Sequence, residues 1–196
     1  MLKFRHFSQG KKGFTLIELL LWISLFSIIF MAFFSVLEYV NNLVRIGDRE
    51  DEILSSARYG IEYIKGEILS ADRIIPIYKF EGLNSKYHNI FDFVILKITE
   101  IKTDNNIENK YNYNYATYYL KNDELIRIAI NKETELLPNA SEFSGHNQIC
   151  TFVMDIDETE LLISDRIIRL QLTMGDNKRV SNNFKTKIYL NCPIEM

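Results

Sequence analysis

The feature that most constrains this chain is an apolar run near its start, preceded by positive charges. The nineteen residues of Leu19–Leu37 carry no formal charge. At about 1.5 Å per helical residue, they suffice to cross a hydrocarbon core of roughly 30 Å. The segment before the run is basic, with side chains at Lys3, Arg5, Lys11 and Lys12. We therefore expect a single-pass cell-membrane protein with a cytoplasmic N-terminus and an extracytoplasmic remainder.

This leader differs from an ordinary secretory signal, in which a small-residue cleavage site follows the apolar run. The sequence FFSVLEYVNN of residues 33–42 contains no such site. A cut between Gly13 and Phe14 would instead remove the charges and keep the helix. The GFTLIE sequence of residues 13–18 resembles the prepilin motif of type IV pilins and type II secretion pseudopilins. In that family a membrane peptidase cuts after the glycine and methylates the new N-terminal residue, here Phe14, so residues 1–13 would be the leader.

One acid, Glu18, precedes the uncharged run. A carboxylate at the centre of a bilayer costs about 3 kcal/mol on insertion scales, and the sixteen apolar residues of the uncharged run, at roughly 0.3–0.6 kcal/mol each, outweigh it. The plain interpretation is an acid that reaches the aqueous interface. The resemblance implies instead that Glu18 pairs with the freed amino group of Phe14 on a neighbouring subunit and sets the register of assembly.

Composition limits the other functions of the chain. Without the leader, 19 basic residues face 26 acidic ones, a formal charge of −7, which gives no general attraction to DNA or anionic lipid. There is no GxSxG, no phosphate-binding glycine loop and no HExxH motif. His6, His88 and His146 lie in unrelated segments without metal-ligand spacing. We expect neither an enzyme nor a cofactor or metal site.

The two cysteines, Cys150 and Cys192, both follow the membrane segment, where a disulfide can persist. A bridge would close a loop of about 43 residues and stabilise the fold by about 4 kcal/mol in the chain-entropy model. Two separate buried thiols are the alternative, and the sequence leaves both open.

After the apolar run the helical pattern continues but becomes amphipathic, with apolar residues three or four positions apart. They are Val40, Leu43, Val44, Ile53, Ala57, Ile61, Ile64 and Ile68. We predict one helix from about Phe14 to Ala71, ending before Pro76. Residues 14–37 would lie in lipid, and residues 38–75 would pack on a head formed by residues 76–196.

Beyond Pro76 the period changes to two, which predicts strands. They cover residues 91–98, 111–120, 125–130, 148–156, 166–174 and 184–192, with polar loops at 103–110 and 131–147. Asn122–Asp123 predicts a tight hairpin turn. The expected class is α+β, with a long N-terminal helix followed by an antiparallel β-sheet head, as in pilins.

Two clusters in the head have structural and functional interpretations. One face of the strand 111–120 carries Tyr111, Tyr113, Tyr115, Thr117 and Tyr119. These rings suit a sugar- or surface-binding platform, but aromatic pairs also stabilise sheets without a ligand, and we expect the latter. An acidic group comprises Asp155, Asp157, Glu158 and Glu160. We expect these acids to be a solvated loop rather than a calcium or acid–base site.

Weaker similarities extend the resemblance. The segments 57–74, 118–127 and 186–192 are similar to parts of W-type minor pilins and J-type pseudopilins. This implies a minor subunit in the initiation or tip complex of a surface filament. Its implied partners are other pilins through their N-terminal helices, the prepilin peptidase and methylase, and a membrane assembly platform. Three alternatives remain: a competence pseudopilin for DNA uptake, an adhesive pilin that binds a ligand directly, and an uncleaved membrane-anchored sensor.

Overall fold

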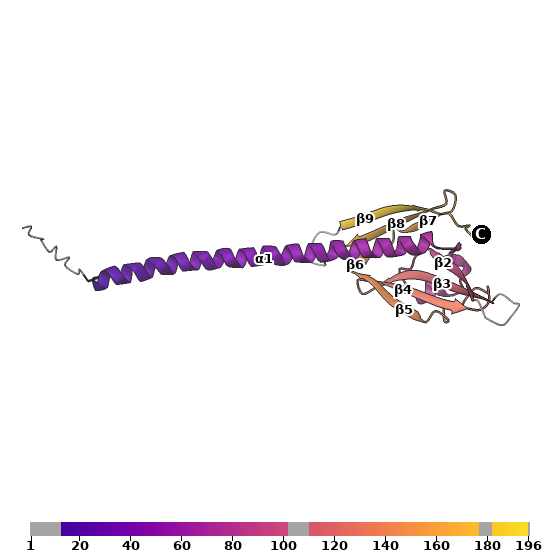
Figure 1. The fold of residues 1–196 in the computed structure, drawn as a ribbon, viewed down its shortest axis with the longest axis horizontal. Helices are drawn as coiled ribbons and strands as arrows, with labels where there is room; N and C mark the ends of the chain where they lie inside the picture. Colours follow the sequence, from indigo (N-terminus) through magenta and orange to yellow (C-terminus); the bar gives the residue numbers. More distant parts are fainter. Residues whose placement is uncertain (1–12, 102–109, 177–181, 196) are drawn as a thin grey trace, which may run out of the picture. The chain divides into compact units, whose positions relative to one another are not determined.

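The computed structural model describes residues 13–101, 110–176 and 182–195. One long helix, α1 (Leu16–Leu69), precedes a series of strands (Figure 1). The strands are β1 (Arg73–Pro76), β2 (Phe93–Ile101), β3 (Lys110–Lys121), β4 (Glu124–Lys132), β5 (Gly145–Thr151), β6 (Val153–Asp155), β7 (Glu160–Leu162), β8 (Ile167–Met174) and β9 (Asn182–Tyr189). Two short helices, η1 (Ile77–Lys79) and α2 (Leu83–Lys86), follow β1. The predicted α+β class with a long N-terminal helix is confirmed.

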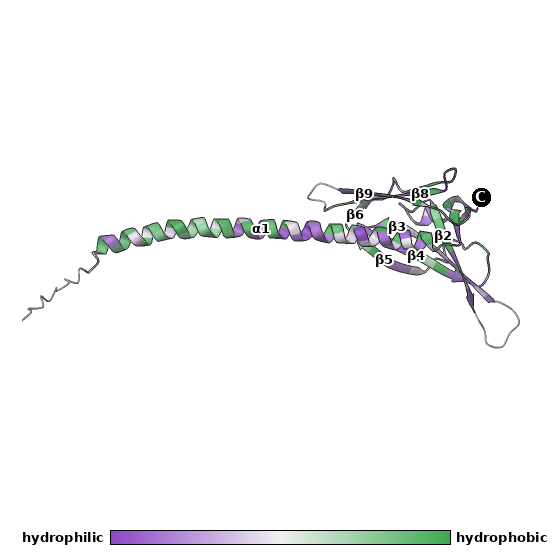
Figure 2. Ribbon diagram, turned by 45° about the horizontal axis from the view of Figure 1, so that its top comes forward, coloured by the Kyte–Doolittle hydropathy of each residue, from purple (hydrophilic) through white to green (hydrophobic). Residues whose placement is uncertain are grey.

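The chain divides into two compact units, one ending at Arg49 and the other beginning at Glu50. The first contains the apolar part of α1, which is mostly green in Figure 2, before the helix becomes mixed in hydropathy. In the second unit one stripe of α1 is buried, at Ile53, Ala57, Gly60, Ile64 and Ile68. These spacings of three and four follow the predicted amphipathic pattern.

The strands form two antiparallel sheets. The first has the order β1-β2-β3-β4-β5, and the second is built around β8, which pairs with β6, β7 and β9. The prediction of one strand over residues 148–156 is wrong, because Phe152 has a φ of 65° and the chain leaves the first sheet for the second there. An aromatic residue in the left-handed region is unusual, and nothing in the sequence marks it.

Each face of the first sheet has its own apolar core. One cluster joins the buried stripe of α1 to both sheets through residues such as Phe93, Leu125, Leu170 and Leu172. The other lies on the opposite face, where η1, α2 and the segment around Phe143 cover Tyr115 and Ile128. The fold therefore buries the helix stripe between the two sheets and the tyrosine face beneath a separate layer.

The hairpin of β3 and β4 follows the prediction closely. Asn122 and Asp123 have φ values of 51° and 60°, as a two-residue turn with both central residues left-handed requires. The predicted loop 103–110 lies outside the described residues except for Lys110, which begins β3. The loop predicted over 131–147 is shorter, since β4 runs to Lys132 and β5 begins at Gly145.

Candidate functional site

The predicted cleavage point lies immediately before α1. Gly13 and Phe14 are non-helical, and Phe14 is 75% exposed. A Cβ added at Gly13 would meet no other atom within 4 Å. The peptide bond between the two residues is therefore accessible, and glycine is not required there by the packing of the described chain. The other twelve residues of the leader, 1–12, lie outside the described residues.

Glu18 occupies the first turn of α1 and bonds to Thr15. The Thr15 backbone N–H and hydroxyl donate to Oε2 of Glu18 at 3.2 and 3.1 Å, and the Glu18 N–H donates to the Thr15 hydroxyl at 3.3 Å. This reciprocal pattern is a capping box, which satisfies backbone donors that the start of a helix leaves free. The negative charge also lies at the positive end of the helix dipole. Glu18 thus has a structural role besides the one implied by the resemblance.

The apolar part of α1 is uncovered. Every residue from 13 to 45 is exposed, and the helix is long and apolar enough to cross a membrane. A soluble protein rarely exposes apolar surface on this scale, which is typical of contact with lipid or with other proteins. A single long apolar helix near the N-terminus is consistent with one membrane span.

The polar side chains within this apolar part do not require water. The hydroxyls of Ser24, Ser27 and Ser35 donate to the carbonyls of Leu21, Ile23 and Met31 at 2.8–3.1 Å. In hydrocarbon an unpaired hydroxyl would be costly, so these internal bonds make the serines compatible with lipid. Three phenylalanines add an apolar ladder, in which Phe30 lies 5.9 Å from Phe26 and 4.9 Å from Phe34 between ring centroids.

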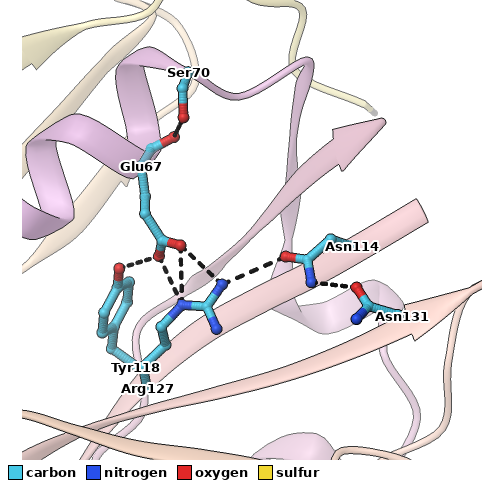
Figure 3. A network of polar contacts seen from close by, with 6 residues as sticks. All are labelled: Glu67, Ser70, Asn114, Tyr118, Arg127 and Asn131. Carbon is cyan, nitrogen blue, oxygen red and sulfur yellow. Dashed lines mark hydrogen bonds and ion pairs between the residues drawn. The ribbon is translucent and has the colours of Figure 1, made fainter. Parts of the chain in front are cut away.

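In the second unit a polar network joins the end of α1 to the first sheet (Figure 3). Nε of Arg127 donates to both carboxylate oxygens of Glu67, at 2.9 and 3.0 Å, and its Nη2 lies 2.8 Å from Oε1. The Tyr118 hydroxyl donates to the same carboxylate. Arg127 continues to Asn114, whose amide donates to Asn131 at 2.5 Å. Hydrogen bonds thus link the last turns of α1 to β3 and β4.

This network is largely shielded from water. The side chains of Arg127 and Glu67 are 13% and 23% exposed. Burial, followed by the charge of Glu67, raises the pKa of Tyr118 well above its ordinary value. Burial alone would lower the pKa of Arg127, but the hydrogen bond and charge of Glu67 outweigh that effect and raise it. Arg127 therefore stays charged and Tyr118 stays protonated at neutral pH.

In the structure Cys150 and Cys192 are both free, buried thiols, which is one of the two arrangements that the sequence left open. Burial raises the pKa of Cys150 to about 12 and also raises that of Cys192. Thiols in such surroundings are poor nucleophiles, because little thiolate forms near neutral pH.

The tyrosine face of β3 is mainly a core face. Tyr115 and Tyr119 belong to the second apolar cluster, and Tyr113 packs against it. Thr117 donates to the Phe93 carbonyl at 2.8 Å, so its hydroxyl is satisfied internally. Only Tyr111 on this face is exposed. The structural interpretation of the ladder is confirmed for the buried rings.

The acidic group has local partners. Glu160 pairs with Arg169, Glu158 pairs with Lys185 at 3.4 Å, and Asp155 accepts from the backbone N–H of Asp157 at 2.9 Å. Among the described residues, no three histidine, cysteine or acidic side chains gather as a metal site would need. Ion pairs across the second sheet therefore account for Glu158 and Glu160.

The capping box and the polar network around Glu67 were not predicted from the sequence, for different reasons. The Thr15–Glu18 capping box has a readable signature, since a threonine followed three residues later by glutamate precedes an apolar run. Glu67, Tyr118 and Arg127 are at least nine and up to sixty positions apart, and no local pattern connects them. Comparison of the chain with protein-family models, curated proteins and solved structures finds no match.

Proposed function

We propose that this chain is a prepilin: it inserts into the membrane through α1, is cut between Gly13 and Phe14, and becomes a minor subunit of a type IV pilus or a related pseudopilus. The observation that carries the proposal is the GFTLIE segment, in which Gly13 and Phe14 lie in exposed chain just before α1 and the apolar helix that follows is exposed as far as residue 45. The basic leader supports a cytoplasmic N-terminus, which leaves the sheet-containing unit outside the cell membrane.

Assembly follows from the same physical property that drives insertion. An apolar helix can leave lipid without a large penalty only when other apolar surface replaces it. Neighbouring subunits that present the same kind of helix supply that surface. The partners are therefore other pilins, and a membrane assembly platform that brings the subunits together. Cleavage of the chain and methylation of Phe14 are carried out by a separate peptidase and methylase.

Glu18 gives the assembly its register in this proposal. Removal of the leader creates a charged amino group on Phe14, and a carboxylate in an apolar surrounding is stabilised by a positive partner. Within one chain Glu18 is already engaged by Thr15 through neutral donors only. The amino group of a neighbouring subunit would add the opposite charge that these hydrogen bonds lack.

Three variants separate the charge of Glu18 from its capping role. Glu18→Gln keeps an acceptor for the Thr15 N–H, because glutamine also completes a capping box, but it removes the charge. Glu18→Ala removes both, and Thr15→Ala weakens the cap while keeping the charge. Each variant is expressed in the native cells and its recovery in sheared surface filaments is compared with its amount in the membrane.

The proposal expects Glu18→Gln and Glu18→Ala to insert and be processed but to enter filaments poorly, whereas Thr15→Ala enters nearly as well as the wild type. If Glu18→Gln entered filaments as well as the wild type, the charge of Glu18 would not be needed for assembly. Its only remaining role would be to cap α1. The absence of the wild-type chain from every filament fraction would contradict the proposed function itself.

A further inference from the structure

The β1 edge of the first sheet is covered by the segment that follows β9. β1 is the edge strand, paired on one side with β2. On its other side, the Ile74 N–H donates to the Pro193 carbonyl at 3.1 Å, and the Glu195 N–H donates to the Ile74 carbonyl at 2.9 Å. Ile74 and Ile194 thus form an isolated parallel bridge. We name residues 193–195 the strap.

The side chains of the strap are matched to this edge. Ile194 packs against the apolar cluster that contains the buried stripe of α1, and Ile74 is a member of that cluster. The Glu195 carboxylate lies 3.7 Å from both the Arg73 guanidinium and the Lys79 ammonium group. One apolar and one acidic side chain therefore face an apolar edge with two basic side chains, of which Arg73 also pairs with Glu135 at 2.5 Å.

The strap is held weakly compared with the strands beside it. It forms one bridge, whereas β1 is paired with β2 over four residues. Its ion pairs involve partly exposed side chains, at 37% for Arg73, 34% for Glu195 and 21% for Lys79, where solvent screens the attraction. A segment with so few buried contacts opens locally far more often than the whole domain unfolds.

The residues between β9 and the strap are held in place by hydrogen bonds, so the strap can move while they stay fixed. Leu190 donates through its N–H to the Arg166 carbonyl at 2.9 Å, and Nη2 of Arg166 donates to the Cys192 carbonyl at 2.9 Å. These two bonds hold residues 190–192 on the second sheet. The strap begins at the next residue, Pro193, and all its hydrogen bonds and ion pairs given above are to β1 or η1.

We propose that the β1 edge is a docking site for the strap of a second copy of this chain, so that neighbouring subunits exchange straps. An exchanged strap would make the same two backbone bonds, the same apolar contact and the same ion pairs as the chain's own. Because exchange conserves these contacts, the balance between closed and exchanged forms is set mainly by the local concentration of neighbours. An open edge without a strap would otherwise be available for unregulated pairing.

This inference does not depend on cleavage of the leader or on Glu18, so it can fail independently of the proposed function. The test uses two full-length chains in detergent, each with Cys150→Ala and Cys192→Ala to remove the native thiols. One carries Arg73→Cys and a first affinity tag, and the other carries Glu195→Cys and a second tag. A single chain with both Arg73→Cys and Glu195→Cys measures the closed form with the same short bismaleimide crosslinker.

Exchange predicts a crosslinked product that carries both tags, that grows with protein concentration and that falls when excess wild-type chain competes for the edge. The matched control replaces Glu195→Cys with Glu158→Cys, at an exposed acid in the turn between β6 and β7, outside the strap. Near-ultraviolet circular dichroism checks that each variant is folded. Failure to form a two-tag product while the double variant links internally would overturn the proposal, as would equal yields from the Glu158→Cys control.

Discussion

Gly60 of α1 lies against Cys150 of β5 so closely that a Cβ on the glycine would fall 2.7 Å from the Cys150 sulfur and 3.3 Å from its Cβ. This is the contact at which a side chain would most disturb the packing of the helix on the first sheet. Gly47 and Gly66, the other glycines of α1, would each meet nothing within 4 Å. Only one of the three is therefore required by close packing.

Gly60→Ala is expected to destabilise the folded head by about 1–3 kcal/mol, because the added methyl group forces the helix and β5 apart. Gly66→Ala is the matched control and should stabilise the head by about 0.5–1 kcal/mol, since alanine is the better helix former and has room there. Urea unfolding of the full chain in detergent measures both, followed by near-ultraviolet circular dichroism of the tyrosines. Trp22 lies in the apolar part of α1 and would not report on the head.

Cys150→Ala should relieve part of the Gly60→Ala penalty, since it removes the sulfur but leaves the Cβ at 3.3 Å. The two substitutions should therefore be less destabilising together than the sum of their separate effects by about 1 kcal/mol or more. Strict additivity in a double-mutant cycle would show that the close approach is not the cause of the penalty.

Glu67→Ala is expected to destabilise the head by about 2–4 kcal/mol. It leaves the guanidinium of Arg127 largely buried without its counter-charge and the Tyr118 hydroxyl without its acceptor. Tyr118→Phe removes one hydrogen bond only and should cost about 1 kcal/mol. Glu62→Ala, at an exposed position of the same helix, should change stability by less than about 0.5 kcal/mol. A Glu67→Ala effect as small as that of Glu62→Ala would contradict the role of the network.

The burial of the two thiols predicts that they react slowly with alkylating reagents while the chain is folded. Burial raises the pKa of Cys150 to about 12, so at pH 8 the folded chain should react very slowly with iodoacetamide. In denaturant without reductant both Cys150 and Cys192 should be alkylated fully, as counted by mass spectrometry of protein taken from cells. Alkylation that appears only after reduction would mean that the two cysteines are bonded.

The buried tyrosines predict a loss of stability in alkali. Burial raises the pKa of Tyr115 to about 12 from an ordinary value of 10.0, and that of Tyr118 is raised as well. Above pH 10 the unfolded chain therefore releases these protons before the folded chain does, so stability falls as the pH rises from about 10 towards 12. Urea midpoints between pH 8 and 11 measure the fall, which should be smaller in Tyr118→Phe. An equal fall in that variant would remove Tyr118 from the explanation.

Features set by local sequence were predicted well. The bounds of α1 differ from the expected Phe14–Ala71 by two residues at each end, because the helical periodicity continues from the membrane segment to the residues before Pro76. The alternation of Tyr113, Tyr115 and Tyr119 likewise placed the rings on one face of β3, and the φ values at Asn122 and Asp123 follow from residues that tolerate such a turn.

Features set by distant contacts were not predicted. β1 and β7 are too short to show a period of two, and they become strands only because β2 and β8 offer them partners. The break at Phe152 separates two sheets within an apparently continuous strand pattern. Val40, Leu43 and Val44 share the predicted stripe with Ile53, yet they are exposed, since periodicity shows which face is apolar and not what covers it.

The most direct test of the account is the N-terminus of the protein recovered from its native cells. Peptide mapping by mass spectrometry should find a chain that begins at Phe14 and carries one methyl group on its amino nitrogen. The Gly13→Ala variant should retain the leader in the membrane fraction, and its effect cannot be attributed to packing because a Cβ has free space there. Wild-type protein that still begins at Met1, with Gly13 joined to Phe14, would contradict the assignment.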